Sequence, residues 1–307
     1  MIDAVMILGP TASGKTALGV KLAKALSTEV ISIDSALVYR SMDIGTAKPT
    51  EEEKEGVPHH LIDIRDPFES YSAADFVRDC ESEIGRLQTQ GKLPLIVGGT
   101  MLYAKALKEG LNEMPTSDLA IRASIDEEAA RLGWPAMHDK LAEVDPVTAA
   151  RLHRTDAQRI SRALEVYRQT GKPLSSYQSQ PTSGTNYRFL TIGLMPGDRK
   201  QLHERIEKRF LKMIEDGFLD EVKTLMSRSD FDRESPSMRA VGYRQAIEYL
   251  SGEITYSEFI AKGVAATRQL AKRQMTWMRS MPDLLTIDPF TQDAFSVSLS
   301  AIEKAKS

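Results

Sequence analysis

Residues 4–16, AVMILGPTASGKT, decide the fold that this sequence predicts. An apolar run leads into the pattern G-x-x-x-x-G-K-T, from Gly9 to Thr16, and a helical pattern follows. This order is typical of a phosphate-binding loop, in which the glycines allow close backbone approach, Lys15 supplies positive charge and the Thr16 hydroxyl can bind Mg²⁺. The pattern leaves the ligand open, because ATP, another nucleotide or a non-nucleotide diphosphate would fit the same groups.

Short apolar runs alternate with amphipathic segments over the first hundred residues. We predict strands at 4–8, 29–34 and 93–99, and helices at 15–26 and 73–90. Such alternation indicates the α/β class, with a P-loop NTPase-like parallel sheet core flanked by helices. Since ligands gather at the carboxyl ends of parallel strands, we expect three loops to meet there. They are 9–16, 34–39 and 98–103.

A helical insertion interrupts this pattern. Residues 110–118, GLNEMPTSD, have the composition of a linker, and the sequence is helical in pattern from 118 to about 169. A stretch rich in Ser, Pro, Gly and Gln then precedes a strand at 187–196. We therefore predict a discontinuous catalytic core, 1–115 plus 188–307, whose C-terminal part is helical, and an inserted all-helical domain, 116–187.

Composition indicates a globular protein outside membranes. The 307 residues are 41% hydrophobic and 27% charged, and no apolar run approaches the roughly 20 residues of a membrane span. The N-terminal segment carries Asp3 where a signal peptide would carry positive charge. The single Cys80 cannot form an internal disulfide. We expect a cytoplasmic protein with no membrane partner, and a monomer.

The charge is unevenly distributed. The net charge is −3, yet residues 151–280 contain 23 Lys and Arg against 15 Asp and Glu. Late in this region a helical projection places three basic side chains within about 40° of one another, with Leu270 and Trp277 opposite. They are Arg268, Lys272 and Arg279. Such a stripe suits an RNA backbone, although an ordinary solvated face has the same pattern.

Two further loops carry candidate catalytic groups. Asp34 ends the second predicted strand, where a carboxylate can hold Mg²⁺ through water or act as a general base. The alternative is that Asp34, with Ser35, caps a following helix. Thr100 follows Gly98 and Gly99 and either contacts the ligand or caps a helix.

Several arginines form weaker candidates. Arg159 and Arg162 lie three residues apart beside Gln158, so they share a helix face. Arg205 and Arg209 lie four apart and can point towards one anion. Exposed solvated faces explain both pairs equally well.

Residues 239–244 mix basic and aromatic side chains. Arg239, Tyr243 and Arg244 could meet a phosphate and a stacked base, or Tyr243 could belong to the core. His59 and His60 are adjacent in an extended segment, point opposite ways and make a poor metal pair, so we assign them no function.

These segments together resemble the tRNA dimethylallyltransferases, also called tRNA isopentenyltransferases. The resemblance rests on GPTASGKT, DSALVYRSMDIGTAKP, VPHHLID, IVGGTMLY, RALEVYRQTGKP, RIEKRF, AVGYRQ and TRQLAKRQMTWMR, in this order. One departure is Leu37, where many members have glutamine. The resemblance implies transfer of a dimethylallyl group from dimethylallyl diphosphate to N6 of the adenosine 3′-adjacent to the anticodon of tRNA, with Mg²⁺ as cofactor.

The resemblance also implies roles for individual residues. Asp34 would accept the proton of the attacking amine, Thr100 and Arg209 would steady the leaving diphosphate, and Thr16 would hold Mg²⁺. The diphosphate would bind to Gly9, Pro10, Thr11, Ala12, Ser13, Gly14, Lys15 and Thr16. Contacts with tRNA would come from Asp34, Ser35, Ala36, Leu37, Thr100, Arg122, Gln158, Arg159, Ile160, Ser161, Arg162, Arg239, Ala240, Val241, Gly242, Tyr243, Arg244, Lys272, Arg273, Gln274, Met275, Thr276, Trp277, Met278 and Arg279. The insertion would grip the anticodon stem-loop.

Two other functions remain open at this point. A P-loop kinase of a small metabolite or nucleotide would use the phosphate loop and Asp34, but it gives no reason for the basic stripe or the large insertion. A non-catalytic RNA-binding module with a structural nucleotide gives no role to Asp34 beside the phosphate loop. The sequence also leaves open whether a nucleotide such as ATP can occupy the loop.

Overall fold

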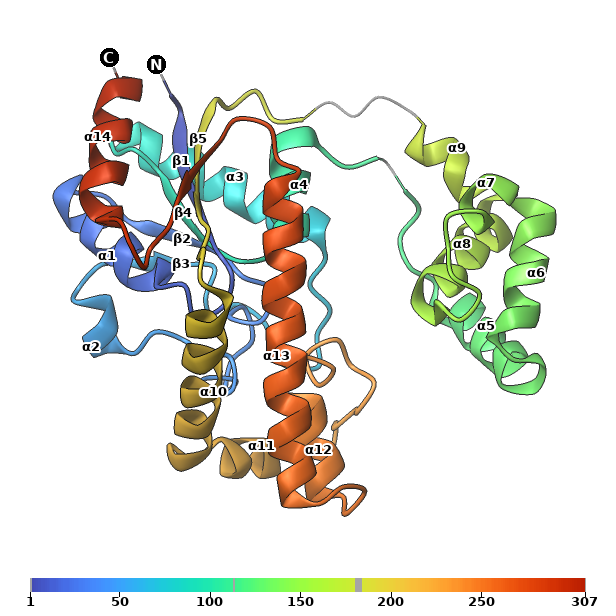
Figure 1. Cartoon of the computed structure of the whole chain (residues 1–307). Coiled ribbons are helices and arrows are strands. Elements are labelled where there is room, and N and C mark those ends of the chain that lie inside the picture. The colour runs from blue at the N-terminus through green and yellow to red at the C-terminus, as the bar shows by residue number, and fades with distance from the viewer. Residues whose placement is uncertain (1, 113, 180–183, 307) are drawn as a thin grey trace. The chain divides into compact units, whose positions relative to one another are not determined.

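The computed structural model describes residues 2–112, 114–179 and 184–306 (Figure 1). The backbone divides into two compact units, which we call the sheet unit, 1–108 with 186–307, and the helical unit, 109–185. Most of the insertion predicted at 116–187 lies within the helical unit. The predicted linker at 110–118 and the polar stretch that follows residue 169 lie partly outside the described residues.

A six-stranded parallel sheet forms the centre of the sheet unit. Its strand order is β3-β2-β4-β1-β5-β6, so β1, which leads into the phosphate loop, lies inside the sheet. The strands are β1 (Ala4–Leu8), β2 (Val30–Ile33), β3 (His59–His60), β4 (Leu95–Gly98), β5 (Phe189–Leu194) and β6 (Leu284–Ile287). The predicted α/β class with a parallel sheet is confirmed.

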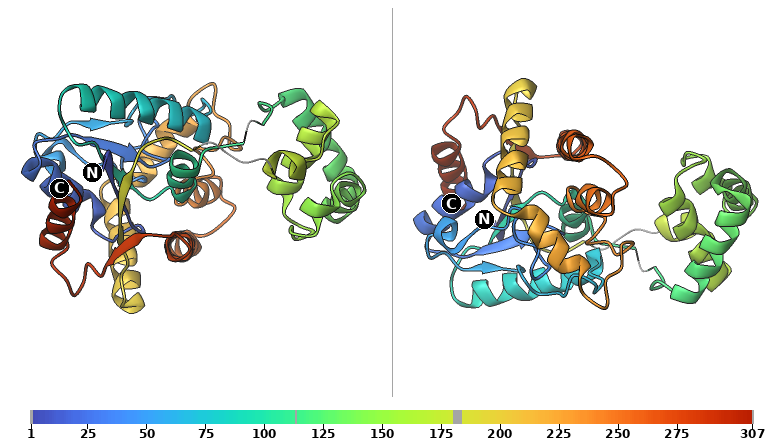
Figure 2. Two further views of the ribbon diagram at one scale, coloured as in Figure 1. Left: turned by 90° about the horizontal axis from the view of Figure 1, so that it is seen from above. Right: turned by 90° about the horizontal axis from the view of Figure 1, so that it is seen from below.

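Side chains of β1 alternate between two cores on the two faces of this sheet. Met6 and Leu8 pack into the core that includes α3 (Ala73–Thr89). Val5 and Ile7 pack into the core that includes α1 (Lys15–Ala25) and α14 (Ala294–Lys306). Figure 2 shows α3 and α14 on opposite faces of the sheet. Burial on both faces explains why β1 is a continuous apolar run and not an alternating one.

The remaining helices of this unit are mostly C-terminal. They are α2 (Glu51–Lys54), α4 (Met101–Glu109), which continues one residue into the helical unit, α10 (Arg199–Glu215), α11 (Phe218–Met226), α12 (Tyr243–Leu250) and α13 (Tyr256–Arg279). Helix α13 runs beside α10 (Figure 1). The two helices approach closely at Gly263, where an added Cβ would lie 2.2 Å from the Phe210 ring.

The helical unit has a core of its own. Its helices are α5 (Leu119–Leu132), α6 (Trp134–Val144), α7 (Pro146–Ala149), α8 (Ala157–Thr170) and α9 (Leu174–Gln178). Ile160 and Leu164 of α8, which the sequence places on one helix face, are buried against Ile125 and Leu141. Gly133 and Asp145 separate the continuous helical pattern predicted for 118–169 into shorter helices.

Most predicted boundaries agree with the structure to within two residues, but the two-residue β3 was expected only as an extended segment, and β6 was not predicted. This strand has only four residues, three of them at least partly exposed, so it carries little apolar signal. Among the residues described, no helix is long and apolar enough to cross a membrane.

Candidate active site

Glycines shape the loop between β1 and α1. A Cβ at position 9 would lie 2.5 Å from Ser13 Oγ, and Gly14 has a φ of +88° at the start of α1. No side chain in the described part of the chain caps this helix, so its first N–H groups and the positive end of its dipole remain available to a ligand. The Ser13 hydroxyl is buried and has no hydrogen-bond partner among the residues that the structure describes. Both observations suit a bound phosphate group.

Three charged side chains gather beside this loop. Burial lowers the pKa of Lys15 to about 8, while the charge of Asp34 opposes this effect and that of Arg209 adds to it. Burial also lowers the pKa of Arg209, again against the attraction of Asp34. Two cations near one carboxylate leave an excess of positive charge, which an anionic ligand would compensate.

Asp34 lies directly after β2, as the sequence predicts. Its Oδ1 accepts a 3.0 Å hydrogen bond from the Ala36 N–H. Its Oδ2 makes no hydrogen bond with any residue that the structure describes. No helix begins in the segment 35–39, so Asp34 does not cap one and its bond belongs to a local turn. One carboxylate oxygen is therefore held while the other can accept a proton.

Thr100 joins the second and third loops. Its Oγ1 accepts a 2.9 Å hydrogen bond from the Ser35 N–H and donates a 3.2 Å bond to Ser35 Oγ. Gly98 lies so close to β2 that an added Cβ would be 2.4 Å from the Ile33 carbonyl oxygen. The three loops meet at the carboxyl ends of the strands, as expected.

Two cavities open on these loops. The first, of about 520 Å³, is lined by Asp34, Thr100, Arg239 and residues of α13. The second, of about 720 Å³, is lined by basic side chains that include Arg205. Five residues line both: Lys15, Thr16, Ala47, Arg209 and Met213. The phosphate loop and Arg209 therefore lie at the boundary between the two cavities.

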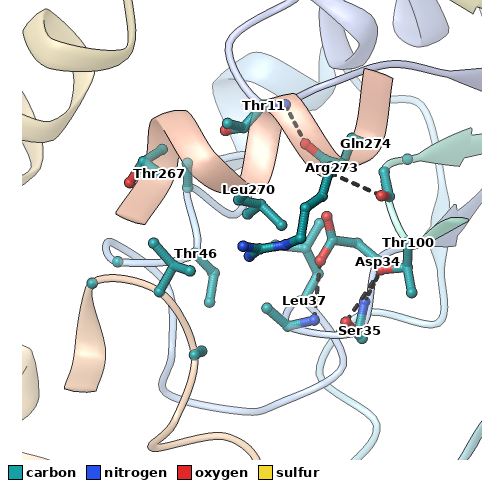
Figure 3. A pocket seen from close by; sticks show the side chains of 18 of the residues that line it. Thr11, Asp34, Ser35, Leu37, Thr46, Thr100, Thr267, Leu270, Arg273 and Gln274 are labelled. Atoms are coloured by element: carbon teal, nitrogen blue, oxygen red, sulfur yellow. Dashed lines mark hydrogen bonds between the residues drawn. The ribbon is translucent and has the colours of Figure 1, made fainter. Parts of the chain in front are cut away.

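Helix α13 forms one wall of the first cavity (Figure 3). Leu270 and Trp277 line the cavity, and Arg273 extends into it (Figure 3). The stripe of Arg268, Lys272 and Arg279 does not line the cavity. Arg268 pairs with Glu207 of α10, whereas Lys272 and Arg279 are exposed. The helix thus turns the side that carries Leu270, Arg273 and Trp277, not its basic stripe, towards the cavity.

Gln274 connects α13 to two of the ligand loops. It is buried, its Oε1 accepts a 3.0 Å hydrogen bond from the Thr11 N–H, and its Nε2 donates a 2.8 Å bond to the Gly99 carbonyl (Figure 3). A Cβ at Gly99 would lie 2.5 Å from Nε2. Gln274 therefore fixes the distance between the phosphate loop and the Thr100 loop.

The expected tRNA contacts are distributed over both units. In the sheet unit, many of them line the first cavity: Asp34, Ser35, Ala36, Leu37, Thr100, Arg239, Ala240, Val241, Gly242, Tyr243, Arg273, Gln274 and Trp277. Arg244 and Thr276 are exposed but do not line it. In the helical unit, Gln158 and Arg159 are exposed, whereas Arg122 and Arg162 both pair with the buried Glu165.

Besides Gln274, four of the expected contacts have buried side chains, which corrects the sequence-based picture. Ile160 and Met278 are completely buried, and Met275 is nearly so. Tyr243 is also fully buried, and its hydroxyl donates a 2.5 Å hydrogen bond to Glu221. Tyr243 therefore belongs to the core, and its ring cannot stack on a base.

Two supporting residues were not found from the sequence. Glu221 accepts hydrogen bonds of 2.7–3.1 Å from the N–H groups of Asp43, Ile44 and Gly45, in a loop that borders both cavities. Lys48 donates to the Tyr39 carbonyl at 2.8 Å and to two carboxylates in the same region. Their partners are distant in sequence or lie in irregular loops, so no periodic pattern could reveal them.

The chain has a parallel sheet, a phosphate loop that leads into the uncapped helix α1, and a carboxylate beside that loop. These features define a P-loop protein that acts on a phosphorylated ligand. The chain belongs to the IPP transferase family, whose family model matches residues 37–281. It is 53% identical over 302 residues to the tRNA dimethylallyltransferase of Paraburkholderia phymatum, covering 97% of this chain and 95% of that protein. It is 56% identical to the enzyme of the same name from Ralstonia pickettii, covering 94% and 91%.

Solved structures agree with this assignment. The full-length tRNA isopentenylpyrophosphate transferase of Bacillus halodurans is 39% identical and superposes with a TM-score of 0.72, covering 99% of this chain and 95% of that one. A eukaryotic dimethylallyltransferase whose structure was determined acting on tRNA is 29% identical, with a TM-score of 0.79, covering 97% and 77%. These similarities support the resemblance seen in the sequence and argue against the kinase alternative.

Proposed function

We propose that this chain transfers a dimethylallyl group from dimethylallyl diphosphate to N6 of the adenosine 3′-adjacent to the anticodon of tRNA. The observation that carries the proposal is the position of Lys15 and Arg209 at the boundary between two cavities, with Asp34 lining only the first. An anion held at this boundary can be reached from the cavity that contains the carboxylate. Membership of the IPP transferase family supports the same chemistry.

In the proposed reaction, the N6 nitrogen attacks C1 of the dimethylallyl group. The N6–C1 bond forms as the C1–O bond breaks, diphosphate leaves with the electron pair, and the N6 proton passes to the free Oδ2 of Asp34. An adenine amine is a weak nucleophile, so positioning, proton removal and compensation of the developing charge must all contribute.

The diphosphate would bind where positive charge is already ordered. The uncapped start of α1, the buried Ser13 hydroxyl and Lys15 form one side of this site, and Arg209 forms the other. Thr100, held by Ser35, lies on the cavity wall near Asp34 and would steady the leaving group. Thr100 is held before the reaction, so little reorganisation of this group would be required as charge develops.

Mg²⁺ fits this arrangement. The exposed Thr16 lies on the wall shared by the two cavities. Over the described part of the chain, no group of three or more His, Cys, Asp or Glu side chains could hold a metal ion. Mg²⁺ commonly binds through few protein oxygens together with substrate phosphates. Thr16 and the diphosphate would hold the ion, which would supply positive charge to the leaving group.

The tRNA would contact the first cavity and the helical unit. Reaching N6 requires the adenosine to leave the stack of the anticodon loop, as other base-modifying enzymes require. Arg239 and Arg273 bring positive charge to the first cavity, and Leu270 and Trp277 give it an apolar wall that suits an extruded base. Arg122 and the more accessible residues of the segment after Asp156, namely Gln158, Arg159, Ser161 and Arg162, would contact the anticodon stem-loop.

One assay tests the proposal against its alternatives. The protein is incubated with unmodified tRNA and either labelled dimethylallyl diphosphate or ATP labelled in its terminal phosphate. We expect label from the first donor in tRNA and no phosphate transfer from the second. Phosphate transfer from ATP without prenylation would support the kinase, and binding of tRNA without either transfer would support a non-catalytic module.

The role of Asp34 is tested by Asp34→Asn, which preserves shape but removes the base. We expect turnover to fall by about 10²–10⁴-fold while the Kd for tRNA changes little. The exposed Glu204 of α10 offers a matched control, and Glu204→Gln should retain full turnover. An Asp34→Asn enzyme that turned over normally at saturation would exclude Asp34 as the base.

A further inference from the structure

A single buried carboxylate links two arginines on the surface of the helical unit. Glu165 of α8 is completely buried. Its Oε2 accepts a 3.2 Å hydrogen bond from Arg122 Nε and a 2.8 Å bond from Arg162 Nη1. The side chains of Arg122 and Arg162 remain 46% and 27% exposed. Both guanidinium groups are therefore held by the buried Glu165 carboxylate while part of each side chain remains exposed to solvent.

The other oxygen of Glu165 holds the backbone that precedes α5. Its Oε1 accepts hydrogen bonds from Ser117 Oγ at 2.7 Å and from the Asp118 N–H at 2.8 Å. With four donors, the carboxylate uses all of its main acceptor positions. Burial alone would raise the pKa of Glu165, but the hydrogen bonds, chiefly from Arg162 and Ser117, outweigh it and lower that pKa.

The arrangement positions both arginines relative to each other. Asp118 caps α5, and Arg122 lies in the first turn of that helix. Glu165 bonds to both residues and therefore fixes both ends of the segment 118–122. Arg162 also donates a 2.6 Å hydrogen bond to the Pro115 carbonyl. On a helical projection Gln158, Arg162 and Glu165 lie within about 60° of one another, so the exposed Gln158 shares this surface.

We propose that Glu165 is a positioning residue that orders Arg122 and Arg162 for contact with the phosphate backbone of RNA. The inference rests on the proposed function, in which the helical unit binds tRNA. An unrestrained arginine loses much rotamer freedom when it binds, whereas a guanidinium already held on one edge loses less. The remaining edge keeps the planar donor pattern that recognises phosphate oxygens.

Glu165→Gln should change the affinity for tRNA in opposite directions depending on whether Glu165 acts only through its charge or by positioning the arginines. Removing a negative charge from an RNA-binding surface should strengthen binding if charge alone matters. The amide, however, presents an NH₂ group to one pair of donors, so either the arginines or the segment before α5 loses its acceptor. We expect the Kd for tRNA to rise about tenfold despite the gain in positive charge.

Glu128 provides the matched control. It lies in the same unit and pairs with Lys140 and Arg168, not with Arg122 or Arg162. Glu128→Gln removes the same charge and also breaks two ion pairs, and we expect its Kd for tRNA to be unchanged or up to about twofold lower. Equal Kd values for the two variants would overturn the proposal.

A double-mutant cycle tests the coupling directly. Arg122→Ala should weaken tRNA binding strongly in the wild-type protein but much less in the Glu165→Gln background, because the arginine is then no longer ordered. Equal losses in the two backgrounds would overturn the inference. If neither Arg122→Ala nor Arg162→Ala affects tRNA binding, the inference fails while tRNA binding persists; if the wild-type protein binds no tRNA, the proposed function fails instead, so the two failures are distinguishable.

Folding is followed by circular dichroism. If Glu165→Gln unfolds the helical unit, Arg122→Lys replaces it, since lysine keeps the charge but loses the guanidinium that Glu165 holds. Its control is Arg154→Lys, at an arginine that pairs with Asp139 and the Pro135 carbonyl. We expect weaker tRNA binding for Arg122→Lys alone, and equal affinity of the two variants would contradict the proposal.

Discussion

Gln274 gives the sharpest test of how α13 supports the catalytic loops. The resemblance to known enzymes includes this residue among the tRNA contacts, whereas its buried amide bonds the Thr11 N–H and the Gly99 carbonyl. A residue that touches tRNA should change tRNA affinity when it is replaced. A residue that positions the two loops should change stability and the use of the diphosphate substrate.

Gln274→Leu removes both hydrogen bonds while nearly preserving volume. The Gly99 carbonyl lies in a buried hydrogen bond, so leaving it unpaired should cost about 1–3 kcal/mol. The Thr11 N–H is only partly buried and can bond to water, so it should add little. For a unit of this size, we expect the Tm to fall by roughly 2–12 °C.

The kinetic assay separates the two roles. We expect KM for dimethylallyl diphosphate to rise and kcat to fall, because the phosphate loop and the Thr100 loop lose their common anchor, while the Kd for tRNA stays close to the wild-type value. Gln269→Leu, at an exposed glutamine of the same helix, should leave stability within about 0.5 kcal/mol and activity unchanged. A raised Kd for tRNA with unchanged Tm and KM would refute the positioning role.

Gln274→Glu adds a pH-dependent test of the same geometry. An ionised carboxylate can still accept from Thr11 but would place an oxygen against the Gly99 carbonyl, whereas a protonated carboxyl can donate to it. The folded state should therefore raise the pKa of this carboxyl, so the variant loses stability as pH rises through that pKa. Its Tm deficit should shrink as pH falls, and a deficit independent of pH would contradict this prediction.

Two other predictions concern the ligand site and the helix beside it. Burial lowers the pKa of Lys15 to about 8, so the affinity of the free enzyme for inorganic diphosphate should fall as pH rises past this value. Lys15→Arg should remove this inflection from the pH profile of the inhibition constant, because arginine stays protonated. A flat profile for the wild-type enzyme would contradict the assignment. Gly263→Ala places a Cβ 2.2 Å from the Phe210 ring, and this crowding should outweigh the gain in helix propensity. We expect chemical denaturation to show a free energy of unfolding lower by about 1–2 kcal/mol. The control Gly85→Ala in α3, with no atom within 4 Å of the added Cβ, should be neutral or stabilising in the same measurement.

Local patterns predicted the parts of the fold that depend on neighbouring residues. The apolar run of β1 and the glycines of the next loop are continuous in sequence, so the strand, the loop and α1 could all be identified. The loop after β2 could be placed as well, because parallel strands end at one edge of a sheet. The four-residue β6 was missed because its half-exposed side chains give no clear period.

Long-range contacts explain what the sequence could not reveal about the site. Thr11 and Gln274 are 263 residues apart, and Asp43 and Glu221 are 178 apart, so no spacing rule connects them. Periodicity separated the basic stripe from Leu270 and Trp277, but Arg273 and Gln274 line the cavity beside these two residues, and the pattern could not tell which side faces the ligand. Packing decides this, because α13 turns Leu270 and Trp277 towards the first cavity.

The two cavities also bear on which atom of the substrate is attacked. In a P-loop kinase, the acceptor must reach the terminal phosphorus that the loop itself holds. In a prenyl transfer, the loop holds the leaving group and the nucleophile must reach a carbon beyond it. Asp34 lines the first cavity but not the second, while Lys15 and Arg209 line both. A base placed beyond the anion-binding boundary suits attack on the carbon, so the same loop that serves phosphate transfer elsewhere would here stabilise departing diphosphate.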